Sequence, residues 1–207
     1  MTDSFVRDYW DNRARTFKTD IERVEWSRRG QLMRFETFLK YHDVRGKSIL
    51  DVGCGTGALL EHLRRRRIEC VYYGCDVSGE MIDLCRKKFK GIFFWNWELP
   101  RATDELYDYV VSFGIHNIKS PTSTAELLQT TRRQFAACRT AAYVSLLTAR
   151  HHGFAPHIQS WSPLYVLDMA LDITPYVTLM HGYLPNDFAV ALYREPLIDT
   201  DKTLILD

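Results

Sequence analysis

Cysteines are few, and none is spaced as in a metal site or a disulfide framework. The chain has five cysteines in 207 residues, an odd number, with no CxxC pair. Small secreted domains and zinc modules carry closely spaced sets of cysteines. The pattern therefore predicts reduced, mostly buried thiols, with neither a disulfide framework nor a metal ion.

Long apolar runs are also missing. The N-terminal sequence MTDSFVRDYWDNRARTF contains no apolar core of the kind that a secretory signal needs, and no later stretch is long enough to span a bilayer. From these features we expect no membrane partner and a cytoplasmic location.

Neither sign of charge dominates the composition. The 27 lysines and arginines are balanced by 26 aspartates and glutamates, which gives a formal net charge of +1. Proteins that bind the nucleic-acid backbone usually have a basic excess. The run Arg64 to Arg67 is a candidate for a local basic patch. We interpret it as the solvated last turn of a helix, where cations complement the helix dipole, and we do not expect nucleic acid as a partner.

From residue 47 to residue 194, short apolar segments alternate with amphipathic ones. We expect strands at residues 47–52, 69–77, 91–97, 107–114 and 140–148, helices at residues 57–67, 78–89, 122–138 and 162–171, and two last strands at residues 175–183 and 187–194. Such alternation predicts an α/β fold with a parallel sheet covered on both faces. The three-residue loop Leu-Pro-Asn between the last two strands predicts an antiparallel C-terminal hairpin.

The sequence before residue 47 reads as helical. Residues 27–42 place Leu32, Phe35, Phe38 and Leu39 along one helical face, with Ser27 as a candidate N-cap. Residues 3–17 predict a shorter amphipathic helix that lies over another part of the protein. We divide the chain into an N-terminal helical lid at 1–46, a core at 47–194 and a polar C-terminal tail at 195–207.

Three glycines at alternate positions follow the first predicted strand, in the stretch DVGCGTG. Glycine destabilises strands and helices, so this spacing indicates a bare, tightly turning backbone against which a ligand lies. In an open α/β sheet, ligands bind at the carboxyl ends of the strands. Asp76 ends the second predicted strand, where an acid accepts hydrogen bonds from the hydroxyls of an adenosine ribose.

Two ligand classes compete for this loop. A dinucleotide site has the pattern GxGxxG and cradles a pyrophosphate, but here the third glycine comes one residue early. Asp51, two residues before the first glycine, would repel a pyrophosphate and would suit a cationic ligand. We therefore favour a positively charged nucleoside and keep a nicotinamide oxidoreductase as a rival interpretation.

The stretch ILDVGCGTG, followed by YGCDVSGEMI, resembles the class I S-adenosylmethionine-dependent methyltransferases. The likeness covers about residues 30–194 and is greatest to small single-domain bacterial members with an N-terminal helical lid. It implies a Rossmann-like, doubly wound, seven-stranded and mostly parallel sheet, with S-adenosylmethionine as cofactor and S-adenosylhomocysteine as product.

The same resemblance implies which residues contact the cofactor. The glycine loop would hold the methionine part, the acid after the second strand the ribose, and the following positions the adenine. The residues matched to these roles, and to the segment after the fourth strand that borders the sulfonium, are Asp51, Gly53, Cys54, Gly55, Asp76, Val77, Met81, Asn96, Trp97, Ser112 and Phe113.

Methyl transfer is an in-line displacement that needs a base only when the nucleophile must lose a proton. His116 is the candidate catalytic base, with helix capping or substrate binding as the alternative. Tyr9, Trp10, Phe17 and Trp26 are candidates for the lid, with core packing as the alternative. His151 and Tyr183 are candidates for the substrate pocket, and the alternative for Tyr183 is a turn that packs its own aromatic ring. The adjacent His151 and His152 would point in different directions, so we expect no metal.

Missing sequence motifs argue against some classes of methyl acceptor. The DPPY-type quartet of enzymes that methylate nucleic-acid amines is missing, and so is a PC dipeptide for attack on cytosine. We expect an oxygen or nitrogen atom of a small molecule as acceptor, in a monomer or homodimer. The alternatives are an RNA or protein methyltransferase and a non-catalytic S-adenosylmethionine-binding protein of the same fold.

Overall fold

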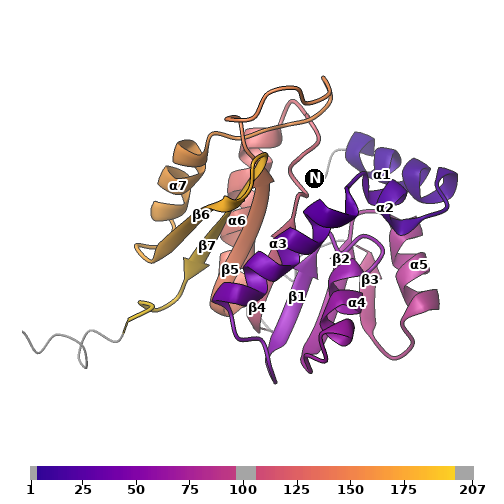
Figure 1. The fold of residues 1–207 in the computed structure, drawn as a ribbon, viewed down its shortest axis with the longest axis horizontal. Helices are drawn as coiled ribbons and strands as arrows, with labels where there is room; N and C mark the ends of the chain where they lie inside the picture. The colour runs from indigo at the N-terminus through magenta and orange to yellow at the C-terminus, as the bar shows by residue number, and fades with distance from the viewer. Residues whose placement is uncertain (1–3, 97–105, 199–207) are drawn as a thin grey trace, which may run out of the picture.

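The computed structural model describes residues 4–96 and 106–198, and its centre is a seven-stranded sheet. The strands are β1 (Ser48–Val52), β2 (Val71–Asp76), β3 (Phe93–Asn96), β4 (Tyr107–Phe113), β5 (Cys138–Leu147), β6 (Val177–Leu184) and β7 (Asp187–Tyr193). They are ordered β3-β2-β1-β4-β5-β7-β6 (Figure 1). Of these seven strands, β7 alone runs opposite to the other six, so it pairs antiparallel with β5 and with β6. The predicted mostly parallel sheet with its C-terminal hairpin is confirmed.

Helices cover both faces of this sheet. They are α1 (Ser4–Thr16), α2 (Asp20–Val24), α3 (Arg28–Tyr41), α4 (Ala58–Arg65), α5 (Gly79–Lys88), α6 (Ser123–Ala137) and α7 (Pro163–Leu171). Residues of α3, α4 and α5 share one hydrophobic core with the sheet, and residues of α6 and α7 share the other. In β1, Ile49 belongs to the first core, whereas Leu50 and Val52 belong to the second. Because both faces are buried, the strands read as nearly continuous apolar runs.

The predicted helix starts agree with the caps that the structure shows. The Ser27 hydroxyl accepts a hydrogen bond from Gly30 N at 3.0 Å, and the Ser78 hydroxyl accepts one from Met81 N at 3.2 Å. Pro163 occupies the first turn of α7. The four arginines from Arg64 to Arg67 are exposed at the end of α4.

The short helix α2 was not predicted, although its sequence carries a capping signal. The Thr19 side chain accepts from Glu22 N, and the Glu22 side chain accepts from Thr19 N, which together form a capping box. Glu25 then ends the helix in the left-handed region at φ 57°. Five residues are too few for a hydrophobic period to be recognised.

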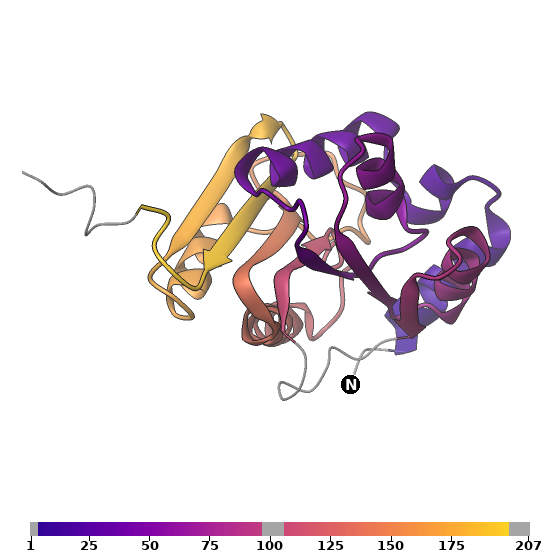
Figure 2. The same ribbon diagram turned by 90° about the horizontal axis from the view of Figure 1, so that it is seen from below.

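The helix α1 lies beside α5 in both views of the fold (Figure 1, Figure 2). Its Asp11 accepts a hydrogen bond from the Ser78 hydroxyl at 2.5 Å, and Arg15 pairs with Glu80 at 3.0 Å. The N-terminal segment is therefore fixed to the start of α5, next to the carboxyl end of β2. Within residues 4–96 and 106–198, no helix combines the length and the apolar character that crossing a membrane requires.

Candidate functional site

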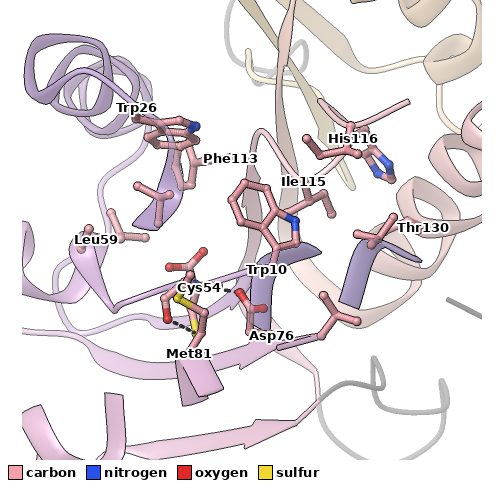
Figure 3. Close-up of a pocket in the computed structure, with 18 of the residues that line it drawn as sticks. Trp10, Trp26, Cys54, Leu59, Asp76, Met81, Phe113, Ile115, His116 and Thr130 are labelled. Carbon is pink, nitrogen blue, oxygen red and sulfur yellow. Dashed lines mark hydrogen bonds between the residues drawn. The ribbon is translucent and has the colours of Figure 1, made fainter. Parts of the chain in front are cut away.

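A cavity of about 400 Å³ lies at the carboxyl ends of β1, β2 and β4; we call it the main cavity (Figure 3). Its size is that of a pocket for a small ligand. Eleven residues expected at a cofactor, catalytic or lid position line it: Trp10, Trp26, Asp51, Gly53, Cys54, Gly55, Asp76, Val77, Met81, Phe113 and His116. The structure thus brings together segments from the N-terminus and from four parts of the core.

The glycine loop forms one wall of the main cavity and is fixed to β2. The backbone N–H groups of Gly53 and Cys54 donate to the carbonyl of Cys75, at 2.8 and 3.0 Å. Gly53 has φ +73°, and a Cβ atom at this position would lie 2.2 Å from Cγ2 of Ile115. Gly57 has φ +77°, and a Cβ there would lie 2.5 Å from the ring of Phe89. The backbone is therefore bare because neither its conformation nor its neighbours accept a side chain.

Asp76 joins the glycine loop to the start of α5. Its carboxylate oxygens accept hydrogen bonds from Gly55 N at 2.8 Å and from Ser78 N at 2.9 Å. Burial nevertheless raises the pKa of Asp76 to about 6, because desolvation outweighs these hydrogen bonds. The carboxylate is held rigidly at the cavity wall, where it is available to hydroxyl donors of a ligand.

Asp51 is a second buried carboxylate in the same wall. One of its oxygens accepts from the Tyr72 hydroxyl at 2.6 Å, and burial raises the pKa of Asp51 to about 7. Within the described part of the chain, neither Asp51 nor Asp76 has a cationic partner. Two desolvated carboxylates at one cavity favour a ligand that brings positive charge and hydroxyl groups. The donor set thus fits S-adenosylmethionine.

His116 lines the main cavity together with Ile115 of the same loop and Thr130 of α6 (Figure 3). Its side chain is 8% exposed, and its Nε2 has no hydrogen-bond partner among the described residues. Burial lowers the pKa of His116 to about 4, so the ring is neutral at pH 7. A neutral imidazole with a free ring nitrogen can accept a proton or hydrogen-bond a ligand.

Two expected cofactor residues do not line the main cavity, and a third is not among the described residues. The Asn96 side chain donates to the carbonyl of Val77 at 3.1 Å, which ties β3 to the turn before α5, and it does not line the cavity. Ser112 is fully buried in β4, and its hydroxyl donates to Gln134 at 3.5 Å. Trp97 lies outside the described residues. Their proposed contacts with a cofactor stay predictions.

Of the expected lid residues, Trp10 and Trp26 line the cavity, while Tyr9 and Phe17 brace the lid itself. The Tyr9 hydroxyl donates to Glu25 at 2.5 Å. The guanidinium of Arg13 lies 4.5 Å from the centre of the Phe17 ring. Each of these contacts is made within the N-terminal helices or to the residues that follow them.

The two expected substrate residues from the C-terminal half are also outside the main cavity. His151 is exposed and packs edge-on against Phe154 at 5.0 Å between ring centres. The Tyr183 hydroxyl donates to the buried carboxylate of Asp187. The expected direct contact of these two side chains with a substrate stays a prediction.

A second cavity of about 320 Å³ adjoins the first; we call it the side cavity. The two cavities share four lining residues, Trp10, Val24, Trp26 and Ile118. The loop after β4 serves both, since His116 lines the main cavity and Asn117 lines the side cavity. Arg34, which we did not predict as a site residue, lines only the side cavity.

Several main-cavity residues also escaped the sequence analysis. Ile115 and Thr56 sit beside predicted positions, and Thr56 carries a buried hydroxyl without a partner in the described structure. Gln129 and Thr130 come from α6, whose amphipathic pattern does not reveal which site it borders. Within the described ranges, no group of three or more histidine, cysteine or acidic side chains could hold a metal ion.

Comparison with known proteins supports this geometry. Residues 49–136 match the family model described as a methyltransferase domain. A protein of Mycobacterium tuberculosis named "Putative methyltransferase Rv1506c" is 39% identical over 72 residues, which are 35% of this chain and 43% of that protein. The chain therefore matches less than half the length of this curated relative.

Solved structures extend the likeness to nearly the whole fold. Magnesium protoporphyrin IX methyltransferase from Synechocystis PCC 6803, crystallised with bound SAH, aligns with a TM-score of 0.66 at 16% identity, over 93% of this chain and 99% of that one. A SAM-dependent methyltransferase from Aquifex aeolicus aligns with a TM-score of 0.61 at 21% identity, over 85% and 99% of the two chains. At these identities the structural likeness shows the fold alone.

Proposed function

Since residues 49–136 match the methyltransferase-domain model, we propose that the chain is a class I S-adenosylmethionine-dependent methyltransferase that transfers a methyl group to an oxygen or nitrogen atom of a small molecule. S-adenosylmethionine is the cofactor of this family. The observation that carries the proposal is the main cavity, where the glycine loop and two buried carboxylates, Asp51 and Asp76, surround one space.

The lining residues have distinct proposed tasks. Asp76 would bind the ribose hydroxyls, and Asp51 would complement the positive charge of the methionine part. Val77 and Met81, on the α5 side of the cavity, would pack against the adenine. When bound, the cofactor supplies an activated methyl group, so the protein has mainly to hold the two reactants in line.

His116 is the proposed proton acceptor. In the reaction, a bond forms between the acceptor atom and the methyl carbon while the bond from carbon to sulfur breaks. A hydroxyl or neutral amine acceptor gains positive charge as this bond forms and must release a proton, which the free Nε2 can take because the ring is neutral. The low pKa of His116 keeps it unprotonated throughout the physiological pH range.

The N-terminal helices, residues 1–46, are proposed to act as a lid on the core at residues 47–194. Trp10 and Trp26 reach from this segment into both cavities. The contacts of Asp11 and Arg15 with the start of α5 hold α1 over the carboxyl end of β2. Such a lid excludes water, which strengthens electrostatic interactions at the methyl donor. Cavities of this size favour a small acceptor over a macromolecule.

Methyl-labelled S-adenosylmethionine tests the proposal directly. The protein is incubated with a desalted cell extract, and the label is counted in low-mass and macromolecular fractions against a boiled-protein control. We expect label in the low-mass fraction. Label in nucleic acid or protein would overturn the acceptor class, and cofactor binding without any transfer would show a non-catalytic binding protein.

Asp76→Ala supplies the matched test of the cofactor site. We expect cofactor affinity to fall by about 1–3 kcal/mol, the cost of losing charge-assisted hydrogen bonds. Calorimetry with S-adenosylhomocysteine measures this, with Asp83→Ala as the control, because Asp83 is an exposed acid on α5 outside the cavity. Equal affinities of the two variants would remove Asp76 from the cofactor site.

A further inference from the structure

The side cavity has apolar walls and one deeply buried cation. Tryptophan, phenylalanine, leucine and isoleucine side chains make up much of its surface. Arg34 of α3 is 5% exposed and lies at the cavity, with its guanidinium carbon 4.5 Å from the centre of the Trp26 ring. A buried arginine is costly unless it is paired, so its partners show what the cavity can bind.

One edge of the Arg34 guanidinium is bound to Asp187. Its Nε donates to Oδ2 of Asp187 at 2.8 Å, and its Nη2 lies 2.6 Å from the same oxygen. Asp187 is fully buried and also accepts from the hydroxyls of Ser145 and Tyr183. Three side chains therefore donate hydrogen bonds to the Asp187 carboxylate, and Arg34 is only one of them.

The other edge of the guanidinium is free. Within residues 4–96 and 106–198, Nη1 of Arg34 has no hydrogen-bond partner. This nitrogen lies 3.2 Å from the position that a Cβ of Gly30 would take, and both residues line the side cavity. The structure thus leaves a charged donor group at the cavity wall without an acceptor.

Asn117 adds a second free donor. Its Oδ1 accepts from the backbone N–H of Leu147 at 3.3 Å, which fixes the orientation of the amide. Nδ2 lies 2.7 Å from the position that a Cβ of Gly114 would take and has no acceptor among the described residues, although Asn117 is only 7% exposed and lines the cavity. Amide and guanidinium donors together suit an oxygen-rich group of a ligand.

The remaining charges of the side cavity also favour an anion. Arg29 is exposed at its rim and has no ion pair in the described structure. Glu25, the acidic lining residue, is already engaged by Tyr9, Arg13 and His157. Among the described residues, the cavity therefore offers free donors on Arg34 and Asn117 and the unpaired charge of Arg29, whereas its acidic group is occupied.

We propose that the side cavity binds the methyl acceptor, and that this acceptor is a small apolar molecule carrying a carboxylate, held by Arg34 and Asn117 with Arg29 at the entrance. The proposal rests on the proposed methyl transfer and names its substrate class. Tyr183 and Ser145 act as positioning residues, because they hold the carboxylate that orients Arg34. Trp10, Trp26 and Ile118 line both cavities, so an acceptor in the side cavity lies next to the main cavity.

Three probes of the same size test the charge preference. Benzoate, benzamide and benzyl alcohol are titrated by calorimetry into protein saturated with S-adenosylhomocysteine. We expect benzoate to bind at least about 10-fold more tightly than either neutral probe, the usual advantage of a charge-assisted hydrogen bond. Equal affinity of the three probes, or no binding of benzoate, would overturn the proposal.

Two variants locate the binding. Arg29→Glu should weaken benzoate about 10-fold, whereas Arg28→Glu, the same change at the adjacent exposed residue outside the cavity, should leave it unchanged. Asn117→Asp keeps the acceptor for Leu147 N and removes the donor, so it should abolish the preference for benzoate. Equal effects of the two arginine variants would overturn the assignment.

The failure of this inference can be told apart from failure of the methyltransferase proposal. S-adenosylhomocysteine affinity is measured separately on each variant. If the product binds and benzoate does not, only the acceptor class is wrong. If the product does not bind, the methyltransferase proposal fails, and the benzoate titration of the free protein still decides whether the side cavity prefers anions.

Discussion

The two cavities that meet at Trp10 and Trp26 carry opposite polar groups. The main cavity has two buried carboxylates, Asp51 and Asp76, with pKa values raised to about 7 and about 6. The side cavity has the free edge of Arg34 and the amide of Asn117. The carboxyl ends of the strands and the N-terminal helices thus form two cavities with different polar groups. The main cavity suits the proposed cationic methyl donor, and the side cavity suits the proposed anionic acceptor.

This difference comes from the elements that supply each wall. The carboxylates of the main cavity come from the carboxyl-terminal parts of β1 and β2, where a parallel sheet presents the side chains of a ligand site. The donors of the side cavity come from α3 and from the loop after β4, and neither belongs to the glycine loop. The first site can therefore follow from the fold, while the second depends on this chain's own side chains.

The largest effect is expected from a substitution in the glycine loop, which should weaken binding in the main cavity and leave binding in the side cavity unchanged. Gly53→Ala should reduce cofactor affinity by about 100-fold, because the new methyl group overlaps Ile115 in the main cavity. Benzoate binding to the free protein should persist. Calorimetry with S-adenosylhomocysteine and with benzoate measures both.

Gly91→Ala is the matched control for the backbone strain at Gly53. Gly91 has a similar φ of +79°, but a Cβ there meets no atom within 4 Å. This variant should lose some stability and keep its cofactor affinity. Equal loss of affinity in both variants would attribute the effect to strain instead of to the cavity.

A second large effect is expected at the proposed base. His116→Gln should lower kcat by about 100-fold while changing cofactor affinity little. In the wild type, turnover should be constant from pH 6 to pH 8 with respect to this group, because the pKa of His116 is lowered to about 4. An acid limb near pH 6.5, or full activity of the variant, would remove His116 from the proton path.

The pH dependence of binding should differ between the cavities. A carboxylate whose pKa is raised in the free protein must lose its proton to bind a cation, so cofactor affinity should rise by about 10-fold or more from pH 5 to pH 8. Benzoate affinity should not rise in this range. Calorimetry with each ligand at pH 5 and pH 8 measures this, and Asp51→Asn should reduce the dependence of cofactor affinity on pH.

The same carboxylates affect the stability of the free protein. Their pKa values are raised above 3.8 on folding, so the unfolded chain ionises first and stability falls as the pH rises toward 7. Because the ligand is expected to bind more tightly when these carboxylates are ionised, S-adenosylhomocysteine should raise Tm more at pH 8 than at pH 5. An equal shift at both values would contradict the role given to these groups.

The smallest expected effect concerns the lid. Tyr9→Phe removes the hydrogen bond to Glu25, a partly exposed contact, and should weaken both ligands by a factor of about 2 to 5. Because Trp10 and Trp26 border both cavities, the two affinities should change together. An effect on one ligand alone would show that Tyr9 does not brace the shared wall.

The elements of the fold could be predicted because their signals are local. Alternating apolar segments marked the strands, and residues such as Ser27 and Ser78 marked helix starts that the structure confirms. The glycine loop and Asp76 were likewise found because strand, loop and acid follow one another closely in the sequence. The short helix α2 was not predicted, because its five residues are too few to show a helical period of apolar side chains.

The side cavity could not be predicted because its residues meet only in three dimensions. Arg34 and Asp187 are 153 positions apart in the sequence. Tyr183 is a predicted substrate residue, and the sequence did not show that its hydroxyl donates to Asp187. Asn96 is a predicted cofactor residue, and the sequence likewise did not show that its amide donates to the carbonyl of Val77. Pairings of this kind depend on the packing of distant elements.

The central claim is that the cofactor and a carboxylate ligand occupy the two cavities at the same time. The most direct measurement is a calorimetric titration of benzoate into the protein, with and without saturating S-adenosylhomocysteine. The account predicts one benzoate per chain in both cases, with affinity that the product does not lower. Competition between the two ligands would contradict it, because both would then occupy the main cavity.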